Sequence, residues 1–188
     1  DMRSKEKEES VYQPLEGIKV LDCTRLLPYQ YCTMILGDLG AEVLKIEEPK
    51  QGDYGRWGDS SRTTESTAFV MANRNKRSMK LNLKDERGKE IFKRLVTIHD
   101  VLLESFRPGV MKRLGLGYEE IRHVKQDIIY CSATGYGQSG PYRDKAGHDI
   151  NYLAISGILG CTGEHTGRPV IPGIPFGDMA GGGVFTAL

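Results

Sequence analysis

Hydrophobic and polar positions follow two alternating patterns along most of this sequence. Short apolar runs rich in β-branched residues predict buried strands, at residues 17–24, 41–49, 100–106 and 127–137. Between these runs, apolar residues recur every three or four positions and predict amphipathic helices, at residues 30–40, 85–99 and 118–125. Strands that alternate with helices are typical of α/β proteins, in which right-handed crossovers join parallel strands. We therefore expect an α/β fold, a parallel sheet with flanking helices.

The two ends of the chain suggest the limits of the domain. The first residues are strongly charged and contain no apolar segment of the kind found in secretory signals, so we interpret residues 1–13 as a disordered charged tail. Residues 177–188 begin like a helix, and this pattern still continues at Leu188. We therefore expect residues 14–188 to form one domain that is truncated at its C-terminal side.

Charge and cysteine usage exclude several classes of partner. The formal net charge is +1, which argues against nucleic acid and anionic membranes as partners. No apolar run approaches the roughly 20 residues of a membrane span. The four cysteines form no C-x-x-C pair, and no histidine stands at zinc-ligand spacing from a cysteine pair. We expect reduced thiols, a cytoplasmic location and no metal.

The junction between the first strand and the first helix, residues 24–32, contains no glycine. A dinucleotide-binding turn needs closely spaced glycines there, because the backbone must approach the pyrophosphate. The sequence therefore argues against NAD and FAD as cofactors, and the Walker A pattern is absent as well.

Two short segments concentrate positive charge in this nearly neutral chain. Residues 73–84 carry five cations and are either a solvated strand edge or a cradle for phosphate groups. Residues 105–115 add Arg107, Lys112 and Arg113 around a Pro-Gly turn. The polar loop 51–66 is long enough to contact a ligand. Without regularly interleaved aromatic residues for base stacking, these segments favour a small polyphosphate over nucleic acid.

Three titratable residues near the C-terminal end are candidates for chemistry. His148 and Asp149 follow a glycine-rich loop, and adjacent side chains diverge, so the two are not expected to act on the same atom. Asp149 is suited to cap a helix that begins at Ile150, whereas His148 is either structural or an acid/base group. Asp178 stands at a helix start, before three glycines that indicate close approach of a packed element or a ligand.

Several motifs, in order from Pro14 to Leu188, together resemble the family III CoA-transferase and α-methylacyl-CoA racemase superfamily. They are PLEGIKVLD, LGDLGAEVLKIEEP, NRNKRS, RPGVMKRLGLGY, GYGQSGP and GHDINY. The resemblance implies a Rossmann-like large domain, a small domain beyond Leu188, and an interlocked homodimer when the chain is full length. It also implies an acyl-CoA enzyme that uses coenzyme A or its thioesters, with a free carboxylic acid as a further substrate in the transferases.

The resemblance assigns roles to residues by position. The residues that match the nucleotide end of CoA are Leu81, Asn82, Leu83, Lys84, Ser105, Phe106, Arg107 and Arg113. The residues that match the loop beside the thioester are Ala146, Gly147, His148 and Asp149. Asp178 matches the carboxylate that forms acyl anhydrides in the transferases. In the racemases, the same Asp178 and His148 are the two bases that exchange the α-proton.

We interpret GHDINY and GDMAGGG as favouring a racemase that acts at the α-carbon of a 2-methylacyl-CoA. In such a racemase, the enolate of the substrate would accept hydrogen bonds from backbone N–H groups near Asp178. Asp178 itself would need a raised pKa to act as an acid, and its position at a helix start opposes that shift. The alternatives are a family III CoA-transferase with Asp178 as nucleophile, and a non-catalytic CoA-binding subunit. Tyr29 and Gln30 depart from the residues usual in both enzyme branches, and Gln30 is a candidate to replace a glutamine that the transferases carry at the position of Leu27.

Overall fold

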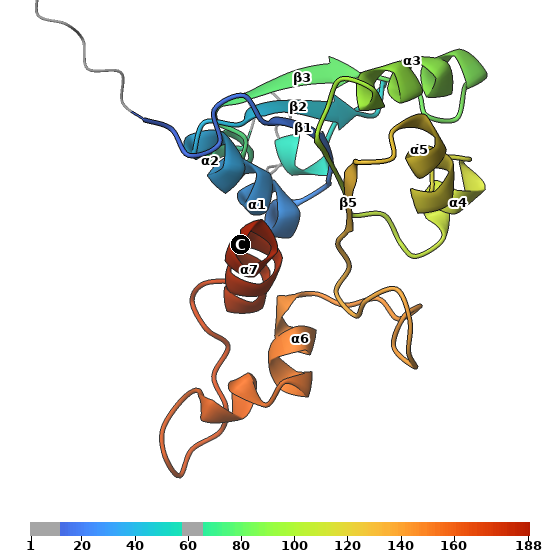
Figure 1. Cartoon of the computed structure of the whole chain (residues 1–188). Helices are drawn as coiled ribbons and strands as arrows, with labels where there is room; N and C mark the ends of the chain where they lie inside the picture. Colours follow the sequence, from blue (N-terminus) through green and yellow to red (C-terminus); the bar gives the residue numbers. More distant parts are fainter. Residues whose placement is uncertain (1–11, 58–65) are drawn as a thin grey trace, which may run out of the picture.

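The computed structural model describes residues 12–57 and 66–188. Its centre is a sheet of five parallel strands (Figure 1). These strands are β1 (Lys19–Cys23), β2 (Glu42–Glu47), β3 (Lys76–Lys80), β4 (Val101–Glu104) and β5 (Ile129–Ser132). Their order across the sheet is β3-β2-β1-β4-β5, so the chain reverses its direction of growth between β1 and β4. In open α/β sheets, ligands bind at the carboxyl ends of the strands beside such a reversal.

Helices connect the strands and cover both faces of the sheet (Figure 1). They are α1 (Leu27–Asp38), α2 (Thr67–Ala72), α3 (Glu86–Val96), α4 (Val110–Arg113), α5 (Tyr118–Val124), α6 (Asp149–Ile155) and α7 (Phe185–Ala187). Two short 3-10 turns, η1 (Tyr54–Arg56) and η2 (Ile158–Cys161), and a π-helical segment, η3 (Gly177–Val184), complete the elements. The α/β prediction is confirmed, and none of the described helices is long and apolar enough to cross a membrane.

The hydrophobic core follows from the alternation of side chains along the strands. Leu21 on β1 and Leu102 on β4 are fully buried, together with Phe92 and Val96 of α3. Val20, one position earlier on β1, points to the opposite face and packs in a second cluster with Val43. Burial of each such side chain contributes about 1.5–3 kcal/mol. The core thus lies on both faces of the sheet and fixes the carboxyl ends of β1 and β4.

Beyond β5 the chain leaves the sheet, forms α6, and returns through η3 to lie beside α1 (Figure 1). Two glycines of η3 make this approach possible. A Cβ at Gly182 would stand 2.6 Å from Pro28 Cβ, and one at Gly183 would collide with the ring of Tyr31. The expected close approach at this glycine run is therefore made by a packed element at Gly182 and Gly183, whereas Gly181 faces open space.

Two predicted segments lie partly outside the described residues. They are residues 1–11 of the charged tail and residues 58–65 of the polar loop. The remainder of that loop contains Gln51–Trp57 and Ser66, where Asp53 caps η1 by accepting a hydrogen bond from Gly55 N–H at 2.7 Å.

Candidate functional site

Arg25, two residues after the end of β1, connects the carboxyl ends of β1 and β4. Its backbone N–H donates to Ser105 Oγ at 2.9 Å. Its guanidinium carbon lies 4.9 Å from the ring centroid of Phe106 and 5.4 Å from that of Tyr54. Arg25 was not among the predicted site residues, and the only signal was its position after the first strand of a β-α unit. The structure thus brings a cation to two of the predicted residues.

The residues that match the nucleotide end of CoA lie after β3 and after β4. Leu81 is buried in the core, and Leu83 and Phe106 pack against the same cluster. The exposed members of this set are Asn82, Lys84, Arg107 and Arg113. The ends of β3 and β4 are three strand spacings apart, about 14 Å, so only an extended ligand would reach both.

A turn after β4 gathers further positive charge. Gly109 adopts a φ of +81°, and a Cβ there would stand 3.2 Å from a terminal nitrogen of Arg113 and 3.8 Å from one of Arg143. The two guanidinium groups therefore approach the same turn from segments far apart in sequence. Guanidinium groups bind phosphate oxygens in a bidentate manner, and Arg143 adds to the predicted set.

Three cations of the basic segment 73–84 form ion pairs with carboxylates. Arg74 forms an ion pair with Asp38, and Arg77 bonds Glu42 at 2.9 Å. Lys76 is buried and donates to Asp22 Oδ2 at 3.3 Å. The interpretation of this segment as a solvated strand edge is confirmed for Arg77, which lies exposed on β3, the outer strand of the sheet. It is wrong for Lys76, whose side chain is buried, and Arg74 precedes the strand.

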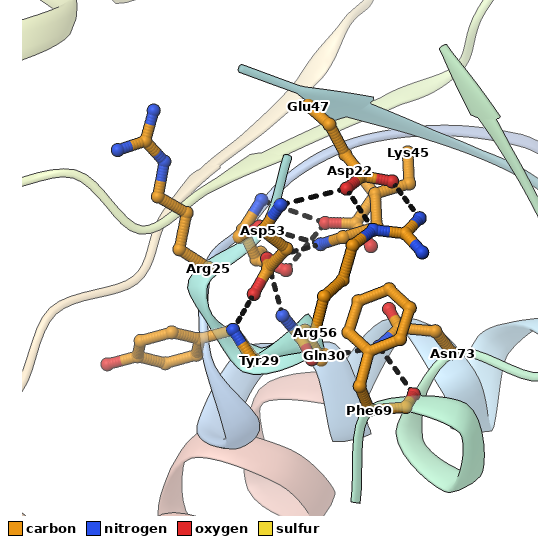
Figure 2. Close-up of polar contacts among 12 residues, drawn as sticks. Asp22, Arg25, Tyr29, Gln30, Lys45, Glu47, Asp53, Arg56, Phe69 and Asn73 are labelled. Atoms are coloured by element: carbon orange, nitrogen blue, oxygen red, sulfur yellow. Dashed lines mark hydrogen bonds and ion pairs between the residues drawn. The ribbon is translucent and has the colours of Figure 1, made fainter. Parts of the chain in front are cut away.

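A buried polar network lies beneath the carboxyl ends of β1 and β2 (Figure 2). Lys45 Nζ bonds Asp53 Oδ2 at 3.1 Å and Thr24 O at 2.8 Å. Asp22 accepts from Thr33 Oγ1 at 2.7 Å. Burial raises the pKa of Asp22, but the charges of Lys45 and Lys76 and two hydroxyl hydrogen bonds outweigh it, so the net shift is downward.

The same network extends to the turn that follows β2. Glu47 accepts from Arg56 Nε at 2.7 Å and from Arg56 Nη2 at 2.6 Å, and its Oε2 also accepts from Asp53 N–H at 2.8 Å. Although burial raises it, the pKa of Glu47 falls to about 2 because Arg56 and Ser78 donate hydrogen bonds to the carboxylate. Each of these carboxylates is paired with a lysine or arginine, and the network connects η1 to β2 and α1.

Gln30 belongs to this network, and the idea that it replaces the transferase glutamine is wrong. The residue is 2% exposed. Its Nε2 donates to Asp53 Oδ2 at 2.6 Å, and its Oε1 accepts from Asn73 Nδ2 at 2.9 Å (Figure 2). Gln30 therefore links α1 to the caps of η1 and α2, and both ends of its amide are engaged with protein groups.

Asp178, His148 and Asp149 come together where η3 packs against α6. Asp178 N–H donates to Asp149 Oδ1 at 3.0 Å. His148 is the N-cap of α6, and its own N–H donates to Asn151 Oδ1 at 2.9 Å. The predicted helix start at Ile150 is wrong by one residue, because Asp149 is the first helical residue and its carboxylate binds η3 instead of capping α6.

The pKa of Asp178 is raised, which is the direction that the racemase interpretation needs. Burial is the largest cause, the negative charge of Asp149 is the second, and His148 opposes both. The helix start does not prevent this shift. However, the N–H of Asp178 already binds Asp149, so it is not free to stabilise an enolate, contrary to our expectation for this group.

Two tyrosines outside the predicted set of site residues border this acidic site. Tyr152 donates its hydroxyl hydrogen to Gly147 O at 2.8 Å, and a Cβ at Gly147 would stand 2.7 Å from the Tyr152 ring. Burial raises the pKa of both Tyr152 and Tyr29, and the charge of Asp178 adds to both shifts. Tyr152 thus holds the loop that carries Gly147 and the exposed Ala146, while both phenols stay protonated beside Asp178.

No cluster of three potential metal ligands occurs within residues 12–57 and 66–188.

Comparison with known proteins gives consistent matches. The profile of CoA-transferase family III matches residues 15–188. Succinyl-CoA:glutarate CoA-transferase of Mus musculus is 50% identical over 171 residues, which are 90% of this chain and 39% of that protein. Alpha-methylacyl-CoA racemase of Homo sapiens is 41% identical over 175 residues, covering 93% and 42% of the two chains. This chain thus spans about two fifths of the length of both relatives.

A solved structure of a CAIB/BAIF family protein from Brucella suis has the same arrangement. Its TM-score is 0.86 at 36% identity, and the match covers 94% of this chain and 48% of that chain. The similarity therefore includes the sheet, the helices that connect its strands and the segment that carries α6 and η3.

Proposed function

Because this chain belongs to CoA-transferase family III, we propose that it forms the CoA-binding part of an enzyme that transfers CoA between carboxylic acids. The observation that carries the proposal is the placement of Asp178. Its carboxyl is half-buried, its backbone is tied to α6, and its pKa is raised. The 50% identity to a named CoA-transferase, against 41% to a racemase, supports transfer over racemisation.

In the proposed reaction, a carboxylate oxygen of Asp178 attacks the thioester carbonyl carbon of an acyl-CoA. The C–S bond breaks, CoA leaves as a thiolate, and a mixed anhydride forms on Asp178. The thiolate then attacks the Asp178 carbonyl carbon, which releases the first acid and leaves an enzyme–CoA thioester. A second carboxylic acid repeats these steps in reverse order, takes CoA away and restores the free carboxylate.

The raised pKa of Asp178 suits this role. A carboxylate becomes a better nucleophile as its pKa rises, provided that the pKa stays below the working pH. Burial next to Asp149 supplies the rise, and the neighbouring His148 limits it. In the proposed reaction, His148 shapes the charge around Asp178 and transfers no proton.

The CoA molecule would lie across the carboxyl ends of the strands. Arg25 over Phe106, with Ser105, forms the wall of its nucleotide site, and Arg107, Arg113 and Arg143 provide charge for its phosphates. The segment Leu81–Lys84, after β3, would contact the far side of the nucleotide. Ala146 and Gly147 would border the thioester, because Tyr152 holds them next to Asp178.

A homodimer of the natural full-length chain and a cytoplasmic location are part of this proposal. Apolar side chains from α6 onward are exposed, such as Ile171 at 67% and Phe185 at 73%. Exposed apolar side chains of this kind are typical of protein contacts, and further sequence or a second copy would cover them.

The racemase is the second candidate, because His148 lies close enough to Asp178 for its charge to act there. One experiment separates the two. The natural full-length protein is given succinyl-CoA and glutarate, and glutaryl-CoA is measured by mass spectrometry. In parallel, a 2-methylacyl-CoA is incubated in D₂O without an acceptor acid.

We expect glutaryl-CoA to form, to disappear in Asp178→Asn, and to persist in His148→Ala. Deuterium at the α-carbon that is lost in His148→Ala would instead support the racemase. CoA binding with neither activity would support the non-catalytic subunit and overturn both enzyme candidates.

A further inference from the structure

We propose that Asp149 is a positioning residue that fastens the backbone of Asp178 to α6 and keeps the Asp178 carboxyl beside His148. This inference rests on the proposed role of Asp178 in catalysis. It gives the Asp149 carboxylate a different task from the ligand contact that the sequence suggested. We name the pair formed by the Asp149 carboxylate and the Asp178 N–H the carboxylate clasp.

The clasp joins two segments that are distant in sequence. Asp149 Oδ1 accepts from Asp178 N–H at 3.0 Å, across 29 positions of the chain. Residues 156–176 between them are largely exposed and form few elements of their own. The position of Asp178 relative to His148 therefore depends on the contacts at the two ends of η3.

Gly177 makes the clasp geometrically possible. A Cβ there would stand 3.1 Å from Asp149 Oδ1 and 3.5 Å from a methyl group of Leu153, which is itself 1% exposed. A side chain at position 177 would crowd the Asp149 carboxylate and require it to shift by a few tenths of an ångström. At the other end of η3, Gly182 gives the close contact with α1. Asp178 is thus held between two tight contacts.

The clasp also places a second negative charge at the site. The groups that act on Asp178 are Asp149 and His148, and its own charge acts in turn on Tyr152 of α6 and Tyr29 of α1. Asp149 is the only carboxylic acid among these neighbours, and it contributes to the raised pKa of Asp178. The same side chain that orients the nucleophile therefore also makes it more basic.

Two substitutions separate orientation from charge. Asp149→Asn keeps an oxygen acceptor for the Asp178 N–H and removes the charge, whereas Asp149→Ala removes both. We expect Asp149→Ala to lower kcat by roughly 10- to 100-fold with little change in KM, because misplacing a reacting group mainly affects the chemical step. Asp149→Asn should lower kcat less and move the acidic limb of the kcat/KM profile to lower pH.

Gly177→Ala gives an independent test, because its methyl group would crowd the Asp149 carboxylate without changing any charged residue. It should reduce kcat in the same direction as Asp149→Ala. The matched control is Glu164→Gln, which removes an exposed acidic charge from the 156–176 segment and should leave the profile unchanged.

The Asp178 carboxyl should also be titrated directly by ¹³C NMR in wild type and in Asp149→Asn. This readout does not require turnover, so the inference can be tested even if Asp178→Asn retains transfer and the proposed function fails. A lower Asp178 pKa in Asp149→Asn supports the clasp. An Asp178 pKa that is unchanged in Asp149→Asn, together with an unchanged kcat in Asp149→Ala, would overturn it. A loss of thermal stability in Asp149→Ala with no change in kcat would also overturn it.

Discussion

The buried polar network and the acidic site place carboxylates in opposite electrostatic settings. In the network, Asp22 and Glu47 face lysine, arginine and hydroxyl donors, and both have lowered pKa values. At the acidic site, Asp178 faces another carboxylate, and its pKa is raised. Burial pushes the pKa upward in both places, so the neighbouring charge decides the direction. The comparison separates carboxylates that hold the fold from the one suited to chemistry.

The largest expected effect concerns turnover at the acidic site. Asp178→Asn should lower CoA transfer by at least about 1,000-fold, because no carboxylate remains to form the anhydride. In the wild type, the pKa of Asp178 is higher in the folded than in the unfolded protein. The Asp178 carboxyl therefore lowers the free energy of unfolding as the pH rises through its pKa in the folded protein. Asp178→Asn should therefore unfold at equal or higher urea concentration at pH 7. A clearly less stable variant would place Asp178 with the structural carboxylates.

The next largest effect concerns stability in the network. Lys45→Met leaves Asp53 buried without its cation, and breaking a buried pair costs about 3–5 kcal/mol. Urea unfolding monitored by circular dichroism measures this loss. Arg77→Met is the matched control, because the exposed Arg77–Glu42 pair contributes at most about 1 kcal/mol. Equal losses in the two variants would contradict the distinction between buried and exposed pairs.

A smaller effect is the pH dependence that Glu47 gives to stability. Its pKa in the folded protein is about 2 against an ordinary value of 4.5, so its contribution is present above pH 4.5. As the pH falls from 4.5 toward 2, this contribution to the free energy of unfolding, about 2 kcal/mol, is lost. Urea midpoints of wild type and Glu47→Gln, measured between pH 7 and pH 3, should converge as the pH falls. Parallel curves would show that Glu47 does not titrate with folding.

The smallest effects distinguish neighbouring glycines of η3. Gly182→Ala places a methyl group 2.6 Å from Pro28 and should cost about 1–2 kcal/mol by separating η3 from α1. Gly181→Ala enters open space and should be neutral or stabilise by up to about 1 kcal/mol. Thermal unfolding measures both, and the reverse order would contradict the packing of η3 on α1.

Much of the sheet could be predicted because its elements are local patterns. The expected strands at 17–24 and 41–49 contain β1 and β2, and the expected helix at 85–99 contains α3. The helix expected at residue 30 begins earlier, at Leu27, because Pro28 is compatible with the first turn. The helices α2 and α4, of six and four residues, were not predicted, since so few residues give no clear period.

The sequence by itself determined the α/β fold, the family and the identity of Asp178 and His148 as candidates. Hydrophobic periodicity and ordered motifs are properties of neighbouring residues, so they can be read from the chain alone. Only the tertiary structure decided that Gln30 is buried, that Arg25 lies on Phe106, and that Asp149 binds the backbone of Asp178. These contacts join residues 23 to 81 positions apart, and packing of separate elements, rather than local pattern, brings them together.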